Sequence, residues 1–96
     1  MGQLLLLVTY KCRQGMRESF LENIKAEGIT DCIRREKGFI RYDYFYSETD
    51  PSELLLVEKW ESSAEQQAHL QTEHMLKFKH IKDKYVAETS VEKILL

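Results

Sequence analysis

The histidines of this chain, His69, His74 and His80, all lie in the second of two helical segments, and imidazole readily exchanges protons near neutral pH. They are spaced five and six positions apart. Two imidazoles on a regular helix reach one metal ion when they are three or four positions apart, so the spacing predicts no metal site. His69, between Ala68 and Leu70, lies at the margin of the apolar stripe. Its ring is either a hydrogen-bonded structural group or a group that faces the space between helix and sheet and exchanges protons there.

Glu58 and Trp60 stand out in a strand predicted over residues 54–60. They are two positions apart and share a face with Leu54 and Leu56. A carboxylate on an apolar face costs free energy unless it is paired or lies near water. Glu58 is therefore either at the wet end of the sheet or held there for a purpose. Trp60, the single tryptophan, is either a core residue or one wall of a pocket for a flat ligand.

A stripe of tyrosines runs along the strand predicted over residues 39–46, which alternates two aromatic-rich sets. The expected faces are Ile40, Tyr42, Tyr44 and Tyr46 on one side and Phe39, Arg41, Asp43 and Phe45 on the other. Such a stripe is typical of a core or a dimer interface. Alternatively, one phenol at the rim of a pocket hydrogen-bonds a quinone or enolate oxygen.

The order of the predicted elements indicates the fold. Apolar periodicity and turn residues place strands at 4–10, 39–46, 54–60 and 85–96, and helical segments at 16–37, bent at Gly28, and at 62–84, pausing near Thr72. This β-α-β-β-α-β order predicts an α+β, ferredoxin-like domain with a four-stranded antiparallel sheet and both helices on one face. The strands starting at Leu4 and Leu54 have apolar residues at odd and even positions alike, and so on both faces. We therefore expect the open face to be covered by a second copy, giving a homodimer through the sheet faces.

Composition excludes several functional classes. The 96 residues predict a single domain, 1–96, and the formal charge of −2 is too balanced for nucleic-acid binding. The apolar run at the start is too short for a membrane span and follows no cationic leader, so a cytoplasmic protein with reduced Cys12 and Cys32 is expected. The sequence has no glycine-rich phosphate loop and no Gly-x-Ser-x-Gly motif, which argues against nucleotide and serine-hydrolase chemistry.

The spacing of several short motifs resembles the antibiotic biosynthesis monooxygenase (ABM) family, which includes quinol monooxygenases. The likeness covers residues 4–95, and Glu58-Lys-Trp60 followed by Ala68-His69-Leu70 is its most specific part. The other matching positions are Gly15, Phe20, Glu36 to Phe39, Tyr42, Glu48 to Pro51, Glu61-Ser62 and Glu73-His74.

The resemblance implies a dimeric α+β barrel and an oxidoreductase activity. Similar proteins oxygenate phenols or quinols with dioxygen and without flavin, metal or haem, because a substrate anion can reduce oxygen once a base has removed its proton. The resemblance implies His69 as proton acceptor or orienting donor and Trp60 as a pocket wall, both catalytic. It implies His74, Tyr44 and Glu58 around the substrate pocket, no cofactor, and a small aromatic or quinone-like molecule as the partner.

Relatives in this family differ in chemistry, so fold alone does not fix the reaction. The alternatives are an isomerase or another proton-transfer enzyme using the same histidine, and a non-catalytic dimer that binds a small molecule. Haem-degrading relatives use an asparagine in the first strand, which residues 4–10 lack. A phosphorylated-sugar isomerase would need basic residues near Trp60 and His69, and the sequence shows no such cluster.

Overall fold

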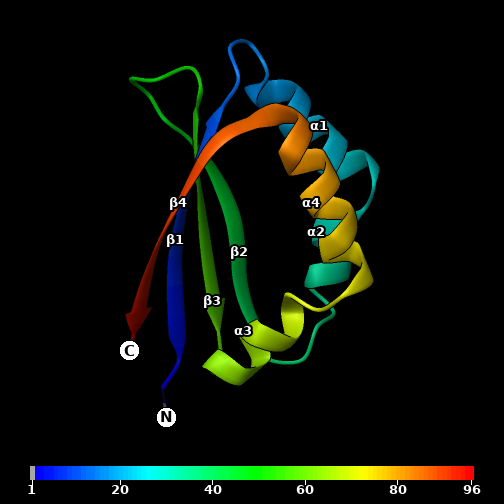
Figure 1. The fold of residues 1–96 in the computed structure, drawn as a ribbon. Coiled ribbons are helices and arrows are strands. Elements are labelled where there is room, and N and C mark those ends of the chain that lie inside the picture. Colours follow the sequence, from blue (N-terminus) through cyan, green and yellow to red (C-terminus); the bar gives the residue numbers. More distant parts are fainter. Residues whose placement is uncertain (1) are drawn as a thin grey trace.

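Four strands form one antiparallel sheet with all the helices on one of its faces (Figure 1). The computed structural model describes residues 2–96, so Met1 of the expected domain lies outside the described part. The elements in chain order are β1 (Leu4–Cys12), α1 (Arg17–Ala26), α2 (Ile29–Ile33), β2 (Phe39–Tyr46), β3 (Glu53–Trp60), α3 (Ser63–His69), α4 (Glu73–Tyr85) and β4 (Val86–Leu95). The strand order β2-β3-β1-β4 confirms the α+β, ferredoxin-like fold.

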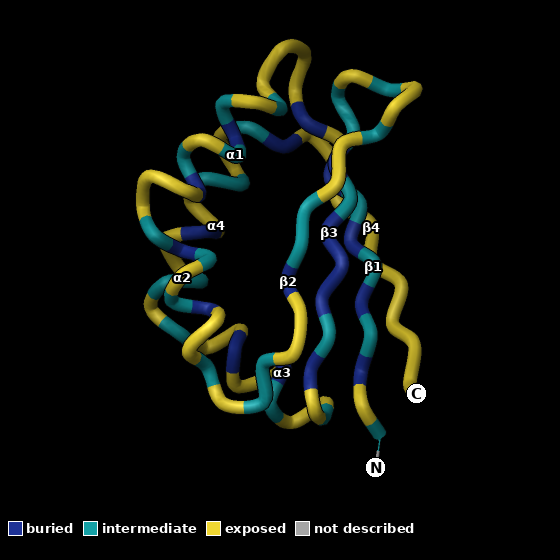
Figure 2. Tube along the Cα trace, turned by 180° about the vertical axis from the view of Figure 1, so that it is seen from behind, coloured by how far each residue is buried: buried dark blue, intermediate teal, exposed yellow. Residues whose placement is uncertain are grey.

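The core lies between the helices and the inner face of the sheet. Alternate residues of β1, from Leu4 to Cys12, are buried, and Figure 2 shows this alternation of burial along β1. Because side chains alternate across a strand, every second residue of β1 packs against the helices. The helices contribute Phe20, Ile24, Ile29, Ile33 and Phe78 to this core. Both cysteines are free thiols, as expected.

Both long helical segments are broken rather than continuous. Gly28 has φ +66°, a left-handed conformation that a helix cannot contain, so the expected bend is a complete break between α1 and α2. The second segment stops after His69, and the Thr72 side chain accepts a hydrogen bond from the Met75 N–H to start α4. Ser62 caps α3 by accepting from the Glu65 N–H, as its sequence predicts.

The N-terminal end of β2 departs from the predicted alternation. The pairing of β2 with β3 shifts register between Phe39 and Arg41, so Phe39 stands opposite Trp60 and packs on the core. Ile40 falls in this irregularity and is 36% exposed, so its expected place beside the tyrosines is wrong. Beyond the irregularity the alternation holds, and Tyr42 is buried at 2% exposure.

No helix covers the outer face of the sheet (Figure 1), and apolar side chains lie on this face. Leu5 and Leu7 of β1 stand opposite Lys59 and Val57 of β3, and Leu55 lies on the same face. These three leucines are only partly buried within one chain. The prediction of an apolar open face is therefore confirmed. Among residues 2–96, no helix has the length and apolar character that crossing a membrane would need.

Candidate functional site

Glu58 is held by the indole of Trp60 inside the domain. The two residues share the inner face of β3, and Trp60 Nε1 donates a hydrogen bond to Glu58 Oε1 at 3.0 Å. Trp60 is fully buried and Glu58 is 6% exposed, so the carboxyl group lies inside the protein rather than at the wet end of the sheet. Burial raises the pKa of Glu58 and is the largest effect on it. The hydrogen bond from Trp60 lowers this pKa by less, and repulsion from Glu36 raises it slightly.

His69, the last residue of α3, packs on the same indole. Its ring centroid is 4.6 Å from that of Trp60, with the planes inclined by 38°. The ring of Tyr42 approaches His69 edge-on at 5.9 Å. His69 is 1% exposed, so the aromatic rings that surround it fix its orientation within the core.

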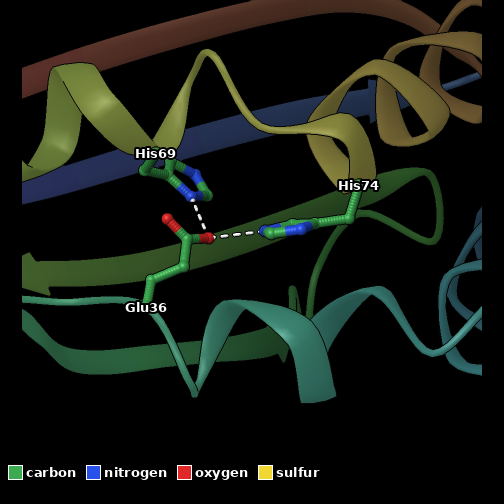
Figure 3. Close-up of side chains that lie close together, drawn as sticks. All are labelled: Glu36, His69 and His74. Atoms are coloured by element: carbon green, nitrogen blue, oxygen red, sulfur yellow. Dashed lines mark hydrogen bonds and ion pairs between the residues drawn. The ribbon is translucent and has the colours of Figure 1, made fainter.

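Glu36 joins His69 to His74 through one carboxylate oxygen (Figure 3). His69 Nδ1 lies 2.8 Å and His74 Nε2 lies 2.6 Å from Glu36 Oε2. Glu36 lies in the turn between α2 and β2, and His74 in the first turn of α4. The argument that a spacing of five keeps His69 and His74 from sharing a ligand holds only on one regular helix. The helix breaks after His69, and this break brings both rings to the same acceptor.

The hydrogen bonds assign the proton of His69. A carboxylate only accepts, so His69 Nδ1 carries the ring proton and donates it to Glu36. Burial lowers the pKa of His69, and the hydrogen bond to Glu36 partly offsets this. The ring is therefore neutral near pH 7, with a free lone pair on Nε2. That nitrogen is buried and has no hydrogen-bond partner within residues 2–96.

A cavity of about 380 Å³ opens between the sheet and α4, beside this histidine. His69, Glu58 and Tyr42 are among the residues that line it. Its other lining residues come from β1, β4, α3 with its C-cap Leu70, and α4. Trp60 does not line this cavity, but it contacts both His69 and Glu58, which do. His74 is also outside the cavity lining and reaches it through Glu36 and His69.

Lysines also line this cavity. Lys79 and Lys82 come from α4, and Lys93 comes from β4. The sequence showed no basic cluster near Trp60 and His69, but the fold brings these lysines to the cavity that contains His69. These lysines lie on other elements than His69 and are distant from it in sequence. No local sequence pattern therefore predicts that they share a cavity with it.

Tyr44 belongs to a different hollow. It lines a second cavity of about 490 Å³ against α1 and α2, together with Tyr46. Its hydroxyl is buried and lacks a hydrogen-bond partner within the described chain, and burial raises its pKa. On the side toward His69, the ring of Tyr44 meets the ring of Tyr42 edge-on, with the centroids 6.0 Å apart. Tyr42, rather than Tyr44, is the tyrosine at the histidine.

Glu36 is the site residue that sequence reasoning missed. It lies 33 positions before His69, in a turn with no periodicity of its own. In the sequence it belongs to the motif Glu36 to Phe39, and no local signal links that motif to a histidine in a distant helix.

Solved structures share this fold. A protein from Bacteroides thetaiotaomicron, described as a conserved protein of unknown function and possible oxidoreductase, is 28% identical, with a TM-score of 0.86 over 99% of this chain and 98% of its own. A Pseudomonas aeruginosa protein is 22% identical, with a TM-score of 0.87 over 100% and 95% of the two chains.

A third structure is named after the family suggested by the sequence motifs. This Nitrosomonas europaea protein is 23% identical, with a TM-score of 0.85 over 100% of this chain and 90% of its own. None of the curated proteins matches the sequence. The family model described as antibiotic biosynthesis monooxygenase matches residues 4–81, which include Glu36, Glu58, Trp60, His69 and His74. The chain therefore belongs to the antibiotic biosynthesis monooxygenase family.

Proposed function

We propose that this protein is a cofactor-independent monooxygenase that oxidises a small, electron-rich hydroxyaromatic or quinol-like compound with dioxygen. The observation that carries the proposal is the setting of the His69 imidazole, whose Nδ1 is hydrogen-bonded to Glu36 while Nε2 has no hydrogen-bond partner among residues 2–96. A base oriented by a carboxylate through its other nitrogen is a recurrent arrangement for proton abstraction.

The proposed reaction begins with proton transfer. A phenol in the cavity gives its hydroxyl proton to His69 Nε2, and Glu36 stabilises the imidazolium through Nδ1. The electron-rich phenolate then reduces dioxygen, and a carbon–oxygen bond forms at a ring carbon. The resulting peroxide takes the proton back from His69, which gives a hydroperoxide and restores the neutral base.

The second half of the reaction removes hydrogen from the same ring carbon. Its electron pair forms the new carbonyl while the O–O bond breaks, and the departing hydroxide combines with the removed proton to give water. The net change is phenol plus dioxygen to quinone plus water. All four electrons come from the substrate, so the reaction requires no flavin, haem, metal or external reductant.

The surroundings of His69 suit such a substrate. The cavity is in the size range of small-molecule sites, and Leu6, Val8 and Phe78 give it apolar walls for an aromatic ring. Glu58 also lines the cavity, and burial raises its pKa, which favours the protonated form that can donate a hydrogen bond to a substrate oxygen.

The apolar outer sheet face supports a homodimer as part of the same proposal. Exposed apolar patches of this kind mark interaction surfaces, and a two-fold contact uses one patch twice. Leu5, Leu7 and Leu55 would become buried against a second copy, leaving the cavity on the helix side of each sheet.

Oxygen uptake with a panel of hydroquinones, naphthols and anthrones tests the activity, with quinone absorbance as a second readout. We expect turnover that falls about 100-fold or more in His69→Ala and about tenfold or more in Glu36→Gln. The matched control is His80→Ala, an exposed histidine on α4. No oxygen uptake over the panel, or equal loss in His80→Ala, contradicts the proposal.

A further inference from the structure

Glu36, His69 and His74 form a set of metal-ligating atoms that the proposed proton transfer uses only in part. Their ligand atoms, one carboxylate oxygen and two imidazole nitrogens, all lie within 4.8 Å of one another. These are the ligand types that zinc and neighbouring first-row ions bind in proteins. A tetrahedral site with ordinary zinc bond lengths has its ligand atoms about 3.3 Å apart. Small side-chain rotations would therefore bring the three atoms to zinc-binding positions.

The three side chains are also held in place before any ion binds. The exposed fractions of the Glu36, His69 and His74 side chains are 11%, 1% and 19%. They come from three separate segments, the turn after α2, the end of α3 and the start of α4, which Figure 3 shows converging. Within residues 2–96, the ion pairs of Glu36 involve only these two histidines, so no lysine or arginine neutralises its carboxylate.

We propose that Glu36, His69 and His74 bind one divalent transition-metal ion, Zn²⁺ being the ion used to test it. The ligating atoms are His69 Nδ1, His74 Nε2 and a carboxylate oxygen of Glu36. Three protein ligands leave a fourth tetrahedral position for water or a ligand, as in open zinc sites. The partial exposure of His74 gives the ion a route from solvent.

Binding would change what His69 does. A neutral imidazole ligated through Nδ1 carries its remaining proton on Nε2, so the nitrogen that accepts a proton in the metal-free protein becomes a donor. This consequence rests on the proposed function and makes the metal-bound form an inhibited state. The binding site itself does not depend on the oxygenation reaction.

Calorimetric titration of the metal-stripped protein with Zn²⁺, and with Co²⁺ as a spectroscopic probe, tests the site. We expect one ion per chain and an absorption spectrum of four-coordinate Co²⁺. His74→Ala, which removes a partly exposed side chain, and the near-isosteric Glu36→Gln should each weaken binding by about tenfold or more. His80→Ala should bind like the unchanged protein. Absence of binding, or binding unaffected by both ligand variants, overturns the proposal.

The ring proton of His69 gives a second readout that involves no turnover. Two-bond ¹H–¹⁵N spectra should show the proton on Nδ1 in the metal-free protein and on Nε2 after Zn²⁺ is added. A proton that stays on Nδ1 while zinc binds would place the ion elsewhere. A protein that consumes no oxygen but shows the zinc titration and the proton shift would refute the proposed function alone.

Discussion

Trp60 and His69 stack with their ring centroids 4.6 Å apart, while the indole N–H of Trp60 donates to Glu58. One fully buried indole thus supports two side chains that line the cavity. The carboxyl group and the imidazole keep their relative positions because both contact the same rigid ring. Trp60 acts on the cavity through these two neighbours.

Replacing Trp60 with Phe should reduce the free energy of unfolding by about 2–4 kcal/mol, through lost packing volume and an unsatisfied Glu58. Urea unfolding followed by far-UV circular dichroism measures this, since the only tryptophan is then absent. The double variant Glu58→Leu with Trp60→Phe should recover part of the loss, because it removes both polar partners. Equal stability of the single and double variants would mean that the hydrogen bond is not responsible.

The strands could be predicted from the sequence because strand alternation is a local property. The strand predicted over 39–46 has those bounds, and the strand predicted over 54–60 starts one residue earlier. The prediction that Trp60 and Glu58 share one face of the strand is confirmed for the same reason, and the structure shows that this face is the inner one. Local alternation could not reveal the register shift at Ile40, which depends on pairing with β3.

The raised pKa of Glu58 predicts how stability depends on pH. The folded state binds this proton more tightly than the unfolded chain does, so the protonated carboxyl contributes stability at low pH that is lost as pH rises through the folded pKa. Glu58→Gln should therefore raise the melting temperature at pH 8, with a gain that shrinks toward pH 4. The amide oxygen still accepts from Trp60.

Thermal unfolding of both proteins at several pH values measures this gap, and each kcal/mol moves the melting temperature of a domain this size by about 4–8 °C. Glu61→Gln, at an exposed position next to Trp60, is the matched control and should show no such gap. A Glu58→Gln protein less stable than the unchanged protein at pH 8 would show that the carboxylate form is the stabilising one.

The histidine site could be predicted only in part. His69 is identified by its place beside an apolar stripe, but its partner Glu36 is joined to it by tertiary folding alone. The spacing of five residues on a regular helix argues against a shared ligand for His69 and His74, but the break after His69 brings both rings to Glu36. Similarly, the sequence around Gly28 does not distinguish a bent helix from the complete break, with a left-handed glycine, that the structure contains.

The proposed dimer predicts that a charge on the outer sheet face separates the subunits. Leu7, opposite Val57 in the centre of that face, is the position to change. Sedimentation should give the unchanged protein twice the 11.4 kDa chain mass and Leu7→Lys a single chain mass. The control is Lys77→Glu, an exposed position on α4. A monomeric unchanged protein at micromolar concentration contradicts the dimer.

Gly38 controls the turn that carries Glu36. Its φ of +83° is a left-handed conformation, and a Cβ added there would lie 2.6 Å from Glu65 Cβ, in the first turn of α3. Gly38→Ala should therefore cost both backbone strain and a steric clash, about 2–4 kcal/mol together.

Gly15 is the matched control, with φ +72° and no atom within 4 Å of an added Cβ, so Gly15→Ala should cost only about 1 kcal/mol of strain. Urea unfolding followed by Trp60 fluorescence compares the two variants. Equal losses would mean that α3 yields to the added methyl group, and that Gly38 is required only for its backbone conformation.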